Sequence, residues 1–335
     1  METKKRVLWV DIAKAISIIS VIISHTVPNP SHVRSLLFSF HMPLFFILSG
    51  YTTKLAQTKA DFFRRLKKNF LHVLLPVIIL LPIGIIVRCA IAGDFSQYFE
   101  YFKTWLGFSD GLYFGAGAML WFVWALFFAK TFMDLIKVAL KTERSELLFI
   151  LLGLLGIFLG ATGHRLPLNI DLILAAIGFI EVGIFWRRNE KTISKYHYPI
   201  LLGSLALWFN LLLNGQYAEI YIRSYPGGII SIIESLAATY VVCEISKIIE
   251  DCANNERGIL KKITNWIVTI GKNTMYIYLF HTFDQTLFSW LWNRQDGSRK
   301  TMILSIAIRL ALNLIAFVLI YLILKKLHSR QKRKI

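Results

Sequence analysis

Residues 7–25 read VLWVDIAKAISIISVIISH, an apolar block whose only ionisable side chains are Asp11, Lys14 and His25. A transmembrane helix needs about 20 mostly apolar residues, so this block is long enough to cross a bilayer. Similar blocks recur along the chain and predict an all-α, polytopic integral membrane helix bundle with about ten transmembrane helices. The predicted spans are residues 7–25, 34–53, 70–92, 118–139, 146–162, 169–186, 198–214, 227–249, 264–288 and 302–325.

The composition also favours a membrane protein. Hydrophobic residues make up 56% of the 335 residues, charged residues make up 17%, and the mean hydropathy is +0.55. In soluble domains the two fractions are about 45–50% and about 25%. The values exclude a disordered chain and argue against a soluble domain, because a soluble core cannot bury so many long apolar blocks. The sequence shows no fixed repeat and no linker, so we expect one membrane domain over residues 1–335.

The cysteine count and the lack of two common metal-binding motifs exclude further classes of protein. Cys89, Cys243 and Cys252 are too few for a disulfide framework. Neither CxxC nor HExxH occurs in the sequence, so we expect no bound metal.

The net charge of +18 follows the predicted topology. Most Lys and Arg residues lie at the two termini and in every second connection between spans, for example in residues 54–68 and 325–334. Connections rich in Lys and Arg stay in the cytoplasm, so both termini are expected there. The charge needs no nucleic acid partner, and we expect a multi-pass protein of the cell membrane, most simply a bacterial plasma membrane.

The first span carries ionisable residues on one face. A charge in the middle of a membrane costs roughly 2.5–3.5 kcal/mol on insertion scales, so such residues face the bundle interior and usually have a function. Asp11 and Lys14 are three residues apart and are neighbours on a helix. Lys14 and His25 are separated by three turns plus about 20° and share a face. A structural Asp–Lys pair with an interfacial histidine is the alternative, and the alignment of all three favours function.

The second span reads RSLLFSFHMPLFFILSGYTT over residues 34–53. His41 lies about two turns from its outer end, and Pro43 removes a backbone donor, which suits the wall of a cavity. Ser49 and Gly50 allow a close approach of another helix near the inner end, and for Gly50 we expect simple packing.

The ninth span places His281 and Asp284 three residues apart in its outer half. An Asp beside a His orients the ring and raises its basicity, although an interfacial Asp that meets water fits the pattern equally well. Arg88 and Arg309 are also expected to line the interior, whereas Lys130 could simply extend to the inner membrane surface.

The connection between the second and third spans reads FFRRLKKNF over residues 62–70. Arg64, Arg65, Lys67 and Lys68 lie near one face of a short predicted helix, where four cations could hold a polyphosphate. Composition alone favours anchoring at the cytoplasmic membrane surface.

The order of several motifs resembles one known family. Lys14 and His25 frame ten residues of the first span, and FHMPLFFILSGY follows at 40–51. The motifs RRLKK (64–68), LWFVWALFF (120–128), LPLNIDLILAAIGFIEVG (166–183) and GKNTMYIYLFH (271–281) then come in turn. The series is similar to the membrane acyltransferase-3 family, over most of the chain, and within it to the fucose 4-O-acetylase-like branch. Many members have Arg in place of Lys14, and some carry an additional soluble esterase-like domain, which we do not expect here.

The resemblance implies an O-acyltransferase that moves an acyl group, usually acetyl from cytoplasmic acetyl-CoA, to a hydroxyl of a cell-surface or lipid-linked glycan. It implies that His25 is the general base or a transient acyl carrier, and that Lys14, held by Asp11, lies deeper and binds the donor or polarises a carbonyl. It further implies a cavity lined by His41, Ser49, His281, Asp284, Arg88 and Arg309, and CoA phosphates bound by Arg64, Arg65 and Lys68.

Two other functions remain open at this point. Many spans with buried charges and a Pro-containing helix also suit a transporter of a small molecule such as an amino acid, without acyl transfer. A scaffold protein of the cell envelope would not need Lys14 or His25. The sequence names neither the acceptor glycan nor the acyl group, and it is compatible with a homo-oligomer.

Overall fold

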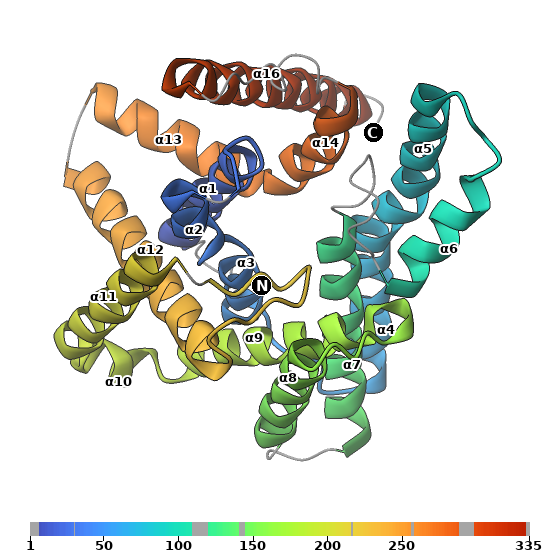
Figure 1. The fold of residues 1–335 in the computed structure, drawn as a ribbon. Coiled ribbons are helices and arrows are strands. Elements are labelled where there is room, and N and C mark those ends of the chain that lie inside the picture. Colours follow the sequence, from blue (N-terminus) through green and yellow to red (C-terminus); the bar gives the residue numbers. More distant parts are fainter. Residues whose placement is uncertain are drawn as a thin grey trace.

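The computed structural model describes residues 7–29, 31–108, 120–140, 145–215, 217–255, 258–287 and 298–332. Within these residues the regular elements are helices, apart from an isolated bridge between Glu219 and Ser224. The all-α class is therefore confirmed (Figure 1). The described helices are α1 (Leu8–Ser24), α2 (His32–Phe38), α3 (His41–Thr52), α4 (Lys59–Asn69), the π-helical turn η1 (Phe70–Leu74), α5 (Leu75–Ala92), α6 (Tyr98–Phe108), α7 (Trp121–Leu140), α8 (Ser145–Ala161), the 3-10 turn η3 (Pro167–Asn169), α9 (Ile170–Arg188), α10 (Glu190–Lys195), α11 (His197–Asn214), α12 (Ile229–Asn255), α13 (Ile259–Lys272), α14 (Thr274–Leu287) and α16 (Arg299–Lys332).

Each predicted span coincides with helical segments, although positions 118, 119 and 288 lie outside the described residues. Among the described residues, five helical stretches are long and apolar enough to cross a membrane, and Ser145–Ala161 is a shorter apolar helix. The five are His32–Thr52, Lys59–Ala92, Pro167–Arg188, Ile229–Asn254 and Arg299–Ile323. A helical membrane bundle is therefore supported, and the count of ten spans stays a prediction.

Many apolar side chains point away from the bundle. Ile78, Ile79 and Ile83 on α5 and Leu202 and Phe209 on α11 are all exposed. Exposed apolar patches of this extent are rare on soluble monomers and are normal where lipid is the solvent.

The second predicted span is not one continuous helix. It divides into α2 and α3 at Ser39 and Phe40. Pro43 is the third residue of α3, in the first turn, where backbone N–H groups lack intrahelical partners in any case. Pro43 therefore marks the start of a helix and does not interrupt one.

The ninth predicted span also divides, into α13 and α14, at Asn273. Asn273 has φ −121° and ψ 21°, outside the helical region, and its side-chain Nδ2 donates to the carbonyl oxygen of Thr269 at 2.8 Å. An Asn side chain that bonds the local backbone competes with helix continuation, which explains the break.

Close contacts through glycine hold the central helices together. A Cβ on Gly50 of α3 would overlap the carbonyl oxygen of Ile180 of α9, and one on Gly183 of α9 would overlap that of Ile47 of α3. Small residues let helix backbones touch, which drives association in membranes. The packing role expected for Gly50 is confirmed.

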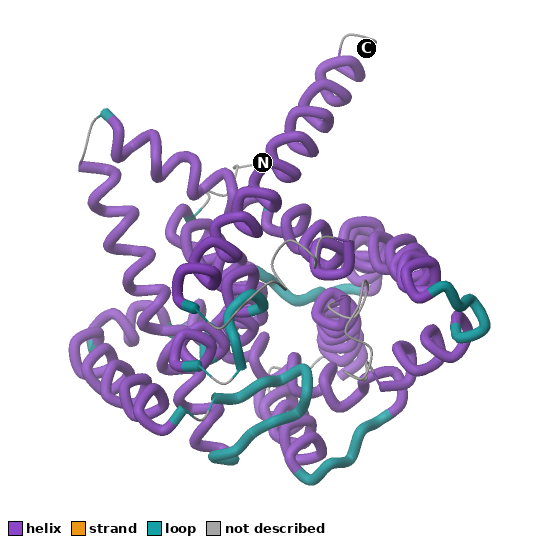
Figure 2. Tube along the Cα trace, turned by 45° about the horizontal axis from the view of Figure 1, so that its top comes forward, coloured by secondary structure: helices purple, strands orange, loops and turns teal. Residues whose placement is uncertain are grey.

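Helix α1 occupies the middle of the bundle (Figure 1). It packs against α3, α12, α13, α14 and α16, which come from both halves of the chain. Figure 2 shows the C-terminal end of α16 projecting beyond the other helices. The central place of α1 brings Lys14 and His25 next to residues from α14 and α16.

Candidate functional site

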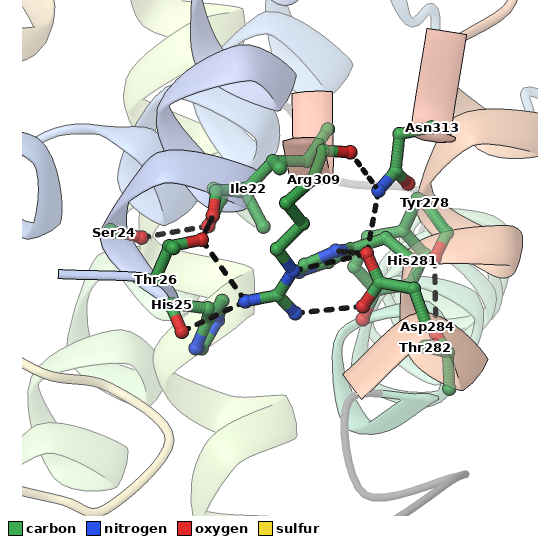
Figure 3. A network of polar contacts seen from close by, with 11 residues as sticks. Ile22, Ser24, His25, Thr26, Tyr278, His281, Thr282, Asp284, Arg309 and Asn313 are labelled. Carbon is green, nitrogen blue, oxygen red and sulfur yellow. Dashed lines mark hydrogen bonds and ion pairs between the residues drawn. The ribbon is translucent and has the colours of Figure 1, made fainter. Parts of the chain in front are cut away.

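A buried polar network joins α14 and α16 to the end of α1 (Figure 3). Arg309 of α16 donates from Nη2 to Asp284 Oδ1 at 2.7 Å and from Nε to Asp284 Oδ2 at 3.1 Å. Both side chains have 0% exposure. Asn313, one turn further along α16, donates to Asp284 Oδ2 at 2.5 Å. A buried carboxylate with this many donors is held in one position, as a bidentate Arg–carboxylate pair requires.

Arg309 also reaches the end of α1. Its Nη1 donates to the carbonyl oxygen of His25 at 2.8 Å and to Thr26 Oγ1 at 3.2 Å. The carbonyl groups at a helix C-terminus lack intrahelical donors, and a guanidinium both satisfies them and complements the negative end of the helix dipole. Arg309 therefore fixes the backbone position of His25 relative to α14.

Two histidine rings face each other in this network. His25 follows the last residue of α1, and its ring centroid lies 5.5 Å from that of His281 at an interplanar angle of 39°. His281 Nδ1 lies 3.0 Å from Asp284 Oδ2. His281 Nε2 is buried and has no hydrogen-bond partner among the described residues. The predicted neighbours His281 and Asp284 are thus in hydrogen-bond contact, and they lie in the interior, away from the protein surface.

His41 and His25 both contact the ring of Phe38. The Phe38 ring centroid is 5.6 Å from that of His25 and 4.7 Å from that of His41. His41 Nδ1 lies 2.7 Å from the carbonyl oxygen of Leu37, which identifies Nδ1 as the donor. This bond and its burial at 1% exposure fix the His41 ring in place beside Phe38.

A cavity of about 240 Å³ lies at the other end of the same face of α1. Its polar lining includes Lys14 of α1, Ser49 of α3 and Lys130 of α7. Lys130 Nζ donates to Ser49 Oγ at 3.3 Å. Tyr278 of α14 also lines the cavity, one turn before His281. Helix α14 therefore connects the wall of the cavity with the histidine pair.

Basic side chains of α4 extend this lysine cluster. The charges of Arg65, Lys14 and Lys68 lie close enough to Lys130 to repel it, and that of Asp134 attracts it. Arg65 Nε donates to Asp134 Oδ2 at 2.7 Å, and the other oxygen of Asp134 accepts the backbone N–H of Ala56 at 2.8 Å. Arg65 is thereby fixed against α7, next to the lysines.

The Arg64 side chain does not point toward the lysines. Its side chain is 76% exposed and pairs with Asp61 of its own helix. Of the three residues expected to bind phosphate, Arg65 is fixed next to the lysines through Asp134 of α7, and Lys68 is exposed. Adjacent residues of a helix point about 100° apart, which explains why Arg64 points elsewhere than Arg65.

A second polar group lies near His25. It joins Arg34 of α2 to Tyr217 and Glu219 of the loop that follows α11. Arg34 of α2 donates from Nε to Tyr217 Oη at 3.2 Å and from Nη1 to the carbonyl oxygen of Ser24 at 3.1 Å. It forms an ion pair with Glu219 at 3.5 Å. Burial raises the pKa of Glu219, and Arg34 opposes this effect. The Arg34 guanidinium lies 3.9 Å from the centroid of the Phe38 ring, and the Phe38 ring in turn contacts His25.

The loop is fixed from its other end by a buried ion pair. Arg223 Nε donates to Asp171 Oδ2 at 2.7 Å, and Arg223 Nη2 donates to Asn169 Oδ1 at 3.0 Å. Leu168, Asn169 and Arg223 all have φ between 57° and 59°, in the left-handed region. Such backbone strain in non-glycine residues persists only where surrounding contacts enforce it.

Two other predicted site residues lie apart from the histidine pair. Asp11 is buried at 2% exposure, and its backbone packs against Gly271 of α13. Arg88 of α5 covers the ring of Tyr101 of α6 at 4.8 Å from the centroid. The expected Asp11–Lys14 ion pair stays a prediction.

Sequence reasoning undervalued Lys130 and did not select Tyr278, Asn313 or Thr26. Of the two positions left open for Lys130, the structure shows the interior one, because Lys130 lines the cavity and contacts Ser49. Its position on the face of α7 that turns toward α3 depends on packing, for which the sequence holds no local signal. Tyr278 could have been found, because it lies three residues before His281 on the same helix face.

Within the described residues, no group of three or more His, Cys, Asp or Glu side chains is placed to hold a metal ion. The fold and the site thus define a helical membrane protein with a paired-histidine centre next to a lysine-lined cavity. The acyltransferase-3 family model, an acyltransferase domain, matches residues 7–325, so the chain belongs to this family. The family assignment and the apolar helices indicate a multi-pass membrane acyltransferase. No curated protein and no solved structure matches the chain.

Proposed function

We propose that this membrane acyltransferase moves an acetyl group from cytoplasmic acetyl-CoA to a hydroxyl of a glycan on the other side of the membrane. One observation carries the proposal: the same two helices line the cavity and hold the histidine pair. Helix α1 contributes Lys14 and His25, and α14 contributes Tyr278 and His281. A donor bound in the cavity would therefore direct its reactive end toward the histidines.

The lysine cluster suits the donor. CoA carries several phosphate charges, and phosphate groups are bound well by Arg and by Lys in a site of low dielectric. Lys14 and Lys130 line the cavity, and Arg65 and Lys68 lie within electrostatic reach of Lys130. We assign the phosphates to these four residues, with both termini and α4 on the cytoplasmic side as the positive-inside rule predicts.

The histidine pair suits the chemistry. A sugar hydroxyl is a weak nucleophile and needs a base in its transition state, a role for which His is well suited near neutral pH. His25 takes this role, or it carries the acetyl group transiently. No hydrogen bond from the described part of the chain reaches the ring nitrogens of His25, so a ring nitrogen is available to substrate.

We place the acceptor beside Arg34, Tyr217 and Glu219. Carboxylate and guanidinium groups recognise sugar hydroxyls as acceptors and donors, and a tyrosine ring provides a contact surface. These side chains are one ring from His25, on the side away from the lysine-lined cavity. Donor and acceptor would thus approach His25 from opposite ends of α1.

Acetyl-CoA with a radiolabelled acetyl group, added to the purified protein in nanodiscs, tests the proposal. We expect the wild type to retain label, or to pass it to envelope glycan from the source cells, and His25→Ala to do neither. A His25→Ala variant that transfers acetyl normally would remove His25 from the mechanism. Transport by folded protein in liposomes without acetyl-CoA would instead support a carrier.

A further inference from the structure

His281 and His25 differ in their hydrogen-bond partners. Asp284 accepts two hydrogen bonds from Arg309 and one from Asn313, so its carboxylate is an acceptor toward His281 as well. His281 Nδ1, 3.0 Å away, must then carry the ring proton. The neutral His281 therefore has its lone pair on Nε2.

This lone pair lacks a donor. His281 Nε2 is buried and unpartnered among the described residues, although buried polar atoms are almost always hydrogen-bonded. The neighbouring ring is that of His25, whose centroid is 5.5 Å away. His25 in turn has a ring N–H with no acceptor in the described part of the chain. The His281 ring thus has an acceptor without a donor, and the His25 ring has a donor without an acceptor.

We propose that His281 is the positioning residue for His25. With substrate bound, His281 Nε2 accepts a hydrogen bond from one ring nitrogen of His25, and the other ring nitrogen of His25 is left unprotonated toward the acceptor hydroxyl. Catalytic hydrogen bonds are often long in substrate-free structures and tighten in the complex. The proposal rests on the acyl transfer proposed above.

The proposed acetyl transfer balances without another reactant. The acceptor oxygen bonds to the acetyl carbonyl carbon, and its proton moves to the free ring nitrogen of His25. The C–S bond of acetyl-CoA then breaks, and the departing sulfur takes that proton from His25. The proton shared with His281 stays on His25, and Asp284 keeps its charge throughout, as the orienting carboxylate does in a Ser-His-Asp triad.

The tautomer of His281 can be measured without any activity. Nitrogen-15 NMR of histidine-labelled protein in nanodiscs distinguishes a protonated Nδ1 from a protonated Nε2, and the His281→Gln spectrum identifies the signal. We expect Nδ1–H in the wild type. In Asp284→Asn the amide donates to Nδ1, so the proton should move to Nε2. An Nε2–H tautomer in the wild type would overturn the proposal, whether or not acyl transfer occurs.

Turnover supplies the second test, measured as CoA release from acetyl-CoA with envelope glycan as acceptor. We expect Asp284→Asn and His281→Phe to lower turnover about 100-fold or more, with acetyl-CoA binding changed less than about two-fold. His281→Gln keeps an acceptor oxygen and should exceed His281→Phe by about ten-fold. Thr282→Val, which removes only a bond to the Tyr278 carbonyl, is the matched control.

The outcomes separate the two proposals. A wild type that releases no CoA would contradict the proposed function and leave the tautomer measurement to decide the role of His281. An active wild type with equal rates for His281→Gln and His281→Phe would overturn the positioning role alone. If Asp284→Asn fails to fold because Arg309 loses its partner, the comparison of the two His281 variants still decides.

Discussion

Lys130 lies where the cavity meets the basic residues of α4. It lines the cavity and donates to Ser49 Oγ, and the charges of Lys14 and Arg65 lie close enough to repel it. A buried lysine among other cations is costly, because burial removes its hydration and like charges in a low dielectric repel, which Asp134 offsets in part. An anionic ligand would remove that cost, which makes Lys130 a sensitive probe of donor binding.

Lys130→Gln should therefore weaken acetyl-CoA binding. Loss of one desolvated charge pair is worth about 1.4 kcal/mol or more, which raises the KM for acetyl-CoA about ten-fold with little change in kcat. Lys137→Gln, two turns along the same helix, is the control and should leave KM within about two-fold. An unchanged KM in Lys130→Gln would show that the phosphates bind elsewhere.

Arg64 and Arg65 form a natural matched pair. Arg65→Gln leaves the buried Asp134 without its guanidinium, so we expect a loss of about 1–3 kcal/mol in stability and a raised KM for acetyl-CoA. Arg64→Gln removes only an exposed pair with Asp61 and should change neither quantity measurably. Thermal unfolding in detergent and a KM titration distinguish the two. Equal effects of both variants would contradict the observed directions of these side chains.

Some of the site could be predicted residue by residue, and some could not. His281 and Asp284 are three apart on one helix, so their contact follows from helix geometry. The partner of Asp284 is Arg309, which belongs to another helix and is brought in by packing of α14 on α16. No local pattern specifies that contact, so the sequence suggested only that Arg309 faces the interior.

At the scale of elements, the contact of α13 with α1 depends on Gly271. A Cβ at this position would overlap the carbonyl oxygen of Asp11, so Gly271→Ala must push the two helices apart. Overpacking of this kind costs about 1–3 kcal/mol. We expect a lower melting temperature and, since α1 also carries Lys14, a reduced affinity for acetyl-CoA.

Gly203→Ala is the matched control for that prediction. Gly203 lies inside α11 with open space where its Cβ would be. The substitution should stabilise the protein, because Ala is favoured over Gly in a helix by about 1 kcal/mol. A melting temperature that moves in the same direction for both variants would mean that helix propensity, and not backbone contact, governs position 271.

The loop that carries Tyr217 and Glu219 depends on the ion pair of Arg223 with Asp171. Both side chains are nearly fully buried, so Arg223→Leu leaves a buried carboxylate unpaired, at a cost of about 3–5 kcal/mol. We expect faster proteolysis of the loop and weaker acceptor binding, with acetyl-CoA binding retained. Weakened acetyl-CoA binding with an intact loop would argue against separate donor and acceptor sides.

At the scale of the whole molecule, the helical segments could be predicted from the length of the apolar blocks alone. Backbone groups in lipid must be satisfied internally, so long apolar blocks become helices whatever their neighbours. The divisions at Ser39–Phe40 and at Asn273 were not predicted as helix boundaries, because they depend on side-chain bonds such as that of Asn273 to Thr269. The arrangement around α1 combines contacts from distant parts of the chain, which hydropathy does not reveal.

In the proposed function, donor and acceptor meet at His25 from opposite sides of the membrane. The most direct measurement uses sealed proteoliposomes with radiolabelled acetyl-CoA inside and envelope glycan outside. We predict labelled glycan outside, absent with His25→Ala and with vesicles that lack the protein. Label that reaches the glycan only when acetyl-CoA and glycan are on the same side would contradict the account.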